Sequence, residues 1–78
     1  MDKKILITYC SSWGYLARAT SLVDRIKAEL KFENVEIVEG RAGIFLVEVD
    51  GVEIFHNKKE QMKYPDEMDV IERIRKVL

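Results

Sequence analysis

The sequence predicts an α/β sandwich in which a mixed four-stranded sheet carries two helices on one face, in the order β-α-β-β-β-α. An apolar run at Ile5–Tyr9 precedes a helical pattern and an alternating segment at Val35–Glu39, and together these predict a βαβ unit with parallel strands. The Asp50-Gly51 pair then separates two apolar segments, which favours a tight antiparallel hairpin with a type I′ turn. We expect the strand order 2-1-3-4 and a single domain over residues 1–78.

The first strand-like segment leads directly to Cys10, which is the only cysteine in the chain. Ser11 and Ser12 follow it, and either residue can cap the N-terminus of the helix beyond them. A thiolate at such a turn faces unpaired N–H groups and the positive end of the helix dipole, which lower a cysteine's pKa. We therefore expect Cys10 to be at least partly exposed, with a pKa below that of a free thiol. The alternative is a structural cysteine buried as a small hydrophobic side chain.

Apolar residues at three- and four-residue spacing predict the first helix over residues 14–31. Its apolar stripe comprises Leu16, Ala19, Leu22, Val23, Ile26 and Leu30. The last helix is predicted to begin at Pro65, because a first turn tolerates the missing N–H of proline. Its apolar stripe comprises Met68, Ile71, Ile74 and Leu78, widened by Val70 and Val77.

The hairpin strands are predicted over residues 44–49 and 52–57. Apolar residues on both faces place the first of them inside the sheet, whereas Glu53, His56 and Asn57 mark the second as an edge strand. With both helices on one side, the other side of the sheet, called here the uncovered sheet face, lacks a covering layer. Because exposed apolar patches commonly mark interaction surfaces, we expect a weak homodimer or a partner protein to bind there.

Composition excludes several classes of function. The chain has 13 basic and 14 acidic residues and a net charge of −1, so neither nucleic acid nor a membrane surface is an expected partner. No apolar run approaches the roughly 20 residues of a membrane-spanning helix, and no signal peptide is expected. A lone cysteine forbids an intramolecular disulfide and fits a reducing cytoplasm. One cysteine and one histidine do not make a zinc site, and His56 is more typical of a structural or exposed strand residue.

Residues 40–43 are predicted to form a turn between two strands. The two glycines in this turn, Gly40 and Gly43, favour a flexible connector and would also let a ligand approach the backbone. The spacing does not match a phosphate-binding loop, because there is no GxGxxG pattern and no terminal Lys-Ser or Lys-Thr pair.

The segment YCSSWGY, from Tyr9 to Tyr15, resembles the YCxxUGY segment of the selenoprotein W-like, or Rdx, family. In that family a Cys-x-x-Sec or Cys-x-x-Cys motif lies between the first strand and the first helix. The resemblance spans nearly the whole chain. It continues in Gly43-Ile44-Phe45, Val47-x-Val49-Asp50-Gly51, Lys58-Lys59, Tyr64-Pro65 and Ile74-Arg75.

The resemblance implies a thioredoxin-like fold and a thiol redox role in the cytoplasm, often associated with glutathione. Cys10 matches the first cysteine of the family motif, whereas Trp13 occupies the position of the selenocysteine or second cysteine. With Trp13 there, dithiol–disulfide cycling within one chain is not available, and we expect the Trp13 ring to form a partial lid on Cys10. The chain also has no proline before its third strand, so the cis-proline with which thioredoxins bind substrate backbone is missing.

Three functions follow as alternatives. In the first, Cys10 forms mixed disulfides with a small thiol such as glutathione, or with a thiol-bearing protein, and an external thiol resolves them. Ser11, Ser12 and Gly43 are then the candidates for contacting the small thiol. In the second, the chain is a redox-inactive binding or adaptor module. In the third, Trp13 stands in place of a selenocysteine, because the selenocysteine codon UGA and the tryptophan codon UGG differ by one base.

Overall fold

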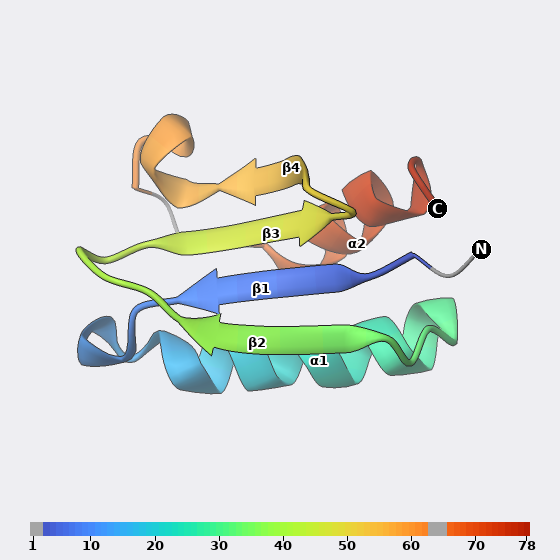
Figure 1. Ribbon diagram of the computed structural model, residues 1–78, viewed down its shortest axis with the longest axis horizontal. Coiled ribbons are helices and arrows are strands. Elements are labelled where there is room, and N and C mark those ends of the chain that lie inside the picture. The colour runs from blue at the N-terminus through green and yellow to red at the C-terminus, as the bar shows by residue number, and fades with distance from the viewer. Residues whose placement is uncertain (1–2, 63–65) are drawn as a thin grey trace.

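The computed structural model describes residues 3–62 and 66–78 and contains the predicted mixed sheet with two helices. The strands are β1 (Ile5–Tyr9), β2 (Val35–Glu39), β3 (Phe45–Val49) and β4 (Val52–His56), and the helices are α1 (Tyr15–Leu30) and α2 (Glu67–Arg75). Two short 3-10 helices, η1 (Ser11–Trp13) and η2 (Asn57–Glu60), follow β1 and β4. The sheet order is β2-β1-β3-β4, with β1 parallel to β2 and the other pairs antiparallel. Both helices lie on the same side of the sheet (Figure 1). The predicted fold class is therefore confirmed.

The core lies between the sheet and the two helices. Alternate residues of β1 and β3 point into it, and Ile5, Ile7, Phe45 and Val47 are completely buried. Aromatic rings meet edge to face across the core, where Phe45 contacts both Tyr15 of α1 and Phe55 of β4. The buried core comprises Ile5, Ile7, Cys10, Tyr15, Ala19, Leu22, Ile26, Phe45, Val47, Val49, Phe55, Val70, Ile71 and Ile74.

The hairpin between β3 and β4 has the predicted turn. Asp50 and Gly51 both have positive φ, at 51° and 81°, as the two central positions of a type I′ turn require. The Asp50 carboxylate also accepts a hydrogen bond from the Lys4 amide at 2.9 Å, which ties the hairpin to the start of β1. A register shift between Val47 and Glu48, which the sequence did not predict, marks a bulge in the β3–β4 ladder.

The beginning of α1 differs from the prediction. Neither serine caps it; the N-terminal cap is Gly14, in the left-handed conformation with φ of 73° and without a side-chain hydrogen bond. The reason is that η1 lies between β1 and α1, and glycine makes the bend from one helix to the next without strain. The apolar stripe consequently includes the buried Tyr15, whereas Leu16 is 47% exposed.

The last helix begins at Glu67, with Asp66 as its cap. The Asp66 carboxylate accepts hydrogen bonds from the amides of Met68 and Asp69 at 3.1 and 3.4 Å. The predicted start at Pro65 lies outside the described residues. The predicted stripe is partly wrong, because Met68 is 48% exposed and Leu78 is also exposed. The residues that α2 buries are Val70, Ile71 and Ile74.

Arg73 attaches α2 to η2 and β4. Its guanidinium donates to both carboxylate oxygens of Glu60, at 2.5 and 3.1 Å, and to the Ile54 carbonyl at 3.3 Å. It also pairs with Asp69 at 2.9 Å and lies 5.6 Å from the centre of the Phe55 ring. The hydrogen bond to Glu60 raises the pKa of Arg73, so the guanidinium stays charged and holds η2 in place.

Asn57 is the one buried polar residue in the described part of the chain, and it continues the sheet beyond the end of β4. Its amide nitrogen donates to the Gly43 carbonyl at 2.7 Å, and its amide oxygen accepts from the Phe45 N–H at 2.9 Å. The Asn57 side chain therefore supplies the donor and the acceptor that the backbone of a neighbouring strand would otherwise supply. It also fixes the loop that precedes β3.

We predict that Asn57→Ala lowers the free energy of unfolding by about 2–6 kcal/mol, because two buried backbone groups each lose a partner at a cost of about 1–3 kcal/mol. Denaturant unfolding followed by circular dichroism measures this change. Asn34→Ala is the matched control, because the Asn34 side chain makes one exposed hydrogen bond, to the Lys3 carbonyl. An equal loss in both variants would contradict the role assigned to Asn57.

Candidate functional site

Cys10 lies at the carboxyl end of β1, between the ends of two neighbouring strands. The preceding residue, Tyr9, is paired with Glu39 of β2 on one side and with Phe45 of β3 on the other. Cys10 itself has extended backbone, with φ of −103° and ψ of 113°, and it caps η1. The predicted placement of a thiol at the turn between the first strand and the first helical segment is therefore confirmed.

The burial of Cys10 contradicts the prediction that its side chain is at least partly exposed. The residue is only 5% exposed and belongs to the core between the sheet and the helices. The physical reason is that β1 is central, so a side chain at its end is covered by both flanking strands and by the helix layer. Burial disfavours a charged thiolate, which opposes the expected effect of the helical turn. The lowered pKa stays a prediction.

The two serines after Cys10 have different partners. The Ser12 Oγ lies 3.0 Å from the Cys10 Sγ, a distance at which either atom can be the donor. The Ser11 hydroxyl instead donates to the Glu39 carboxylate at 2.5 Å, which ties η1 to the end of β2. Both serines are exposed, so the turn that follows Cys10 is accessible to solvent.

The loop over residues 40–43 lies at the same edge of the sheet as Cys10, because it joins the two strands that flank β1. Gly43, a predicted ligand contact, has φ of 73° and uses its carbonyl to bind Asn57. Gly40 is closely packed. A Cβ there would lie 2.6 Å from Ile44 Cγ2 and 2.7 Å from Thr8 Cγ2, so glycine lets this loop pass close to β1.

Trp13 is the last residue of η1, three positions after Cys10. This is the sequence spacing of a two-residue redox motif, with Cys10 as the extended residue before η1 and Trp13 at the end of η1. The Trp13 side chain, and with it the expected lid on Cys10, lies outside the described atoms.

His56 is structural, as expected. Its Nδ1 accepts from the Lys58 N–H at 3.2 Å and caps η2, and β3 lies between its strand and β1. Within residues 3–62 and 66–78, no three His, Cys, Asp or Glu side chains are grouped to hold a metal ion. In the same ranges, none of the helices combines the length and apolarity needed to cross a membrane.

The uncovered sheet face carries more charge than the sequence pattern indicated. The register aligns one mixed row across the sheet, Glu36, Leu6, Glu48 and Glu53, and a second row, Val38, Thr8, Leu46 and His56. In the first row, Glu36 pairs with Lys4 and Glu53 pairs with Lys59. In the second row, Val38 is 37% exposed.

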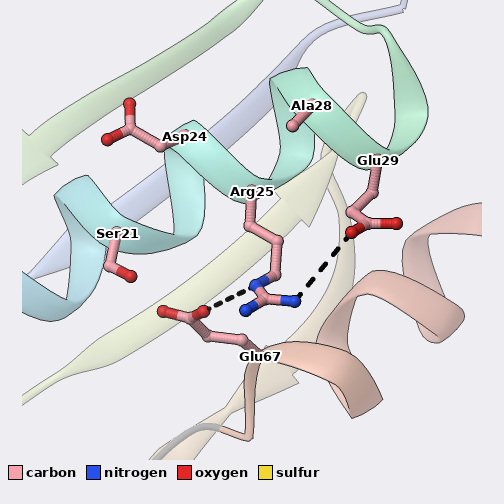
Figure 2. A pocket seen from close by; sticks show the side chains of 6 residues that line it. All are labelled: Ser21, Asp24, Arg25, Ala28, Glu29 and Glu67. Carbon is pink, nitrogen blue, oxygen red and sulfur yellow. Dashed lines mark hydrogen bonds and ion pairs between the residues drawn. The ribbon is translucent and has the colours of Figure 1, made fainter.

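An open hollow of about 360 Å³ lies on the helix side, between α1 and α2. Figure 2 shows the Arg25 side chain extending from α1 toward Glu67 of α2, with Glu29 one turn further along α1. Arg25 binds Glu67 at 3.0 Å and approaches Glu29 at 4.0 Å. The residues that line this hollow include none of the predicted site residues. The hollow is therefore separate from the thiol site.

The sheet order and the thiol after β1 define the class of protein. A mixed four-stranded sheet with both helices on one side, and a cysteine between the first strand and the first helix, is the arrangement of a thioredoxin-like domain. The chain belongs to the Rdx family, whose family model matches residues 4–76.

Individual relatives agree with this assignment. The chain is 32% identical over 73 residues to Migration and invasion enhancer 1 from Bos taurus and 32% identical over 72 residues to the Mus musculus protein of the same name. These alignments cover 94% and 92% of this chain but 63% and 62% of the relatives, so the chain spans a little under two thirds of their length.

Two crystal structures have the same fold. A Bordetella parapertussis protein superposes with a TM-score of 0.90 at 21% identity, and the match covers 100% of both chains. A selenoprotein W-related protein from Vibrio cholerae superposes with a TM-score of 0.89 at 23% identity, over 99% of this chain and 98% of the other. At these identities the likeness concerns the fold.

Proposed function

We propose that this protein is a monothiol redox protein in which Cys10 forms mixed disulfides with a small thiol, such as glutathione, or with a thiol-bearing protein. The observation that carries the proposal is the position of Cys10 at the end of the central strand, where the Rdx family motif has its first cysteine. The Ser12 hydroxyl, 3.0 Å from the sulfur, supports it, because it puts a hydrogen-bond donor beside the reacting atom. A reducing cytoplasm, our proposed compartment, supplies small thiols.

The reaction is thiol–disulfide exchange and needs no cysteine at position 13. The Cys10 thiolate attacks one sulfur of an external disulfide, a new Cys10–sulfur bond forms, and the other sulfur leaves as a thiolate. A second external thiolate then attacks the mixed disulfide and releases Cys10. Each step exchanges one disulfide for another, so the number of disulfides is conserved.

Access to Cys10 requires a small local opening, because the side chain is only 5% exposed. The turn that follows Cys10 is short, and one of its side-chain attachments is the exposed hydrogen bond from Ser11 to Glu39. An incoming thiol would meet Ser11, Ser12 and the loop at Gly43, which all lie at this edge of the sheet. These residues are our proposed contacts for the small thiol.

We predict that the native protein incubated with oxidised glutathione gains the mass of one glutathionyl group, and that reduced glutathione removes it. Intact-mass spectrometry under native conditions measures both steps, with Cys10→Ser as the control that stays unmodified. Circular dichroism before and after verifies the fold. A native protein whose mass is unchanged, under conditions that modify the unfolded chain, would contradict the proposal.

The burial of Cys10 favours a second candidate function, a binding module that performs no chemistry. The uncovered sheet face is its proposed interaction surface, and we propose that a weak homodimer or a partner protein uses it. Glu36, Glu48 and Glu53 lie on that face beside partly buried leucines. Glu36 and Glu53 are paired with Lys4 and Lys59, so the charge that two copies bring together there is mainly that of Glu48, and it makes the contact weak at low salt.

We predict that self-association is weak and strengthens as salt screens the carboxylates on the uncovered sheet face. Sedimentation equilibrium over a wide concentration range, at low and high ionic strength, measures the association constant. Glu48→Gln removes one charge from the face and should strengthen association, whereas Asp24→Gln, on α1, should not change it. A protein that stays monomeric under all conditions would contradict the proposed homodimer.

A further inference from the structure

We propose that Ser12 is a positioning residue for Cys10, and that its hydroxyl donates a hydrogen bond to the sulfur and stabilises the thiolate that attacks a disulfide. The inference rests on the proposed function, because it assigns Ser12 a role in the reaction of Cys10. Its basis is the 3.0 Å distance between Ser12 Oγ and Cys10 Sγ, combined with the burial of the cysteine.

The direction of the hydrogen bond follows from the chemistry of the two groups. A neutral thiol is a weak donor, whereas a hydroxyl is a good donor that rotates to suit its partner. Hydrogen bonds to an ionised acceptor are roughly twice as strong as those between neutral groups. The hydrogen bond from the Ser12 hydroxyl is therefore stronger when Cys10 is a thiolate than when it is a thiol. This difference stabilises the deprotonated form of Cys10.

Burial increases the need for this donor. A thiolate that is only 5% exposed has lost most of its water ligands, and apolar core residues cannot replace them. Ser12 is exposed at its outer side and belongs to the same short turn, so its hydroxyl reaches the sulfur without being buried itself. The turn thus brings a hydroxyl to hydrogen-bonding distance of the buried sulfur.

Ser11 provides a matched control within the same turn. Its hydroxyl points to Glu39 rather than to the sulfur. The other ionisable groups on the elements that adjoin Cys10 are common to all variants, so a comparison between variants isolates the hydroxyl. The groups nearest to Cys10 along these elements are Tyr9 on β1, Tyr15 and Arg18 on α1, Glu39 on β2 and Arg41 in the following loop. The groups further along the same elements are Asp24, Arg25, Lys27 and Glu29 on α1, Glu36 on β2 and Glu48 on β3.

The test is the pH dependence of Cys10 in four variants, Ser12→Ala, Ser12→Val, Ser12→Thr and Ser11→Ala. We expect Ser12→Ala and Ser12→Val to raise the pKa of Cys10 by about one unit, which lowers the thiolate fraction at neutral pH by up to about tenfold. Ser12→Thr keeps a hydroxyl in nearly the shape of valine and should retain the native pKa, as should Ser11→Ala. Titration of the Cys10 ¹³Cβ chemical shift measures each pKa without any reagent reaching the sulfur.

Alkylation by iodoacetamide against pH adds a readout that a purely structural role would not produce. If Ser12 stabilises the thiolate, the midpoint of the rate moves up in Ser12→Ala while the plateau at high pH does not fall. A midpoint that is unchanged or lower in both Ser12→Ala and Ser12→Val would overturn the inference. A sulfur that titrates with the expected shifts but is never alkylated in the native protein would contradict the proposed function and leave the role of Ser12 standing.

Discussion

The pairing of β1 with a strand on each side is the interaction on which the rest of the structure depends. Tyr9, the last residue of β1, is paired with both β2 and β3. The chain therefore leaves β1 between the ends of these two strands. Cys10 is therefore placed between the two neighbouring strand ends and under the helix layer. The same constraint brings the loop over residues 40–43 to the thiol, and it forces a glycine at position 40, where a side chain would collide with β1.

Features that depend on local sequence were predictable. The alternating and apolar segments identified the four strands, and the Asp50-Gly51 pair identified both the hairpin and its turn type. The position of Cys10 at the end of the first strand followed from the same pattern. The ends of the helices were less well predicted, because an intervening 3-10 helix shifted the start of α1 and made Tyr15, rather than Leu16, the first buried residue.

Features that depend on contacts between distant residues were not predictable from one sequence. Asn57 was interpreted as a polar strand end, but it is buried, because the loop before β3 leaves a carbonyl and an N–H that only this amide reaches. The close packing of Gly40 against Thr8 and Ile44 was likewise not predicted. Cys10 was expected to be exposed, and its burial results from packing of strands and helices that the local motif does not contain.

The central claim is that a buried cysteine at the end of β1 is a functional thiol that the native protein exposes by a local opening. Thiol labelling of Cys10 across low denaturant concentrations, compared with the free energy of global unfolding, tests this claim most directly. The account predicts that the opening which exposes Cys10 costs less than global unfolding and depends little on denaturant, because it moves only the end of β1 and the residues packed directly around it. An opening with the same free energy and the same denaturant dependence as global unfolding would contradict it, because Cys10 would then be a structural core residue.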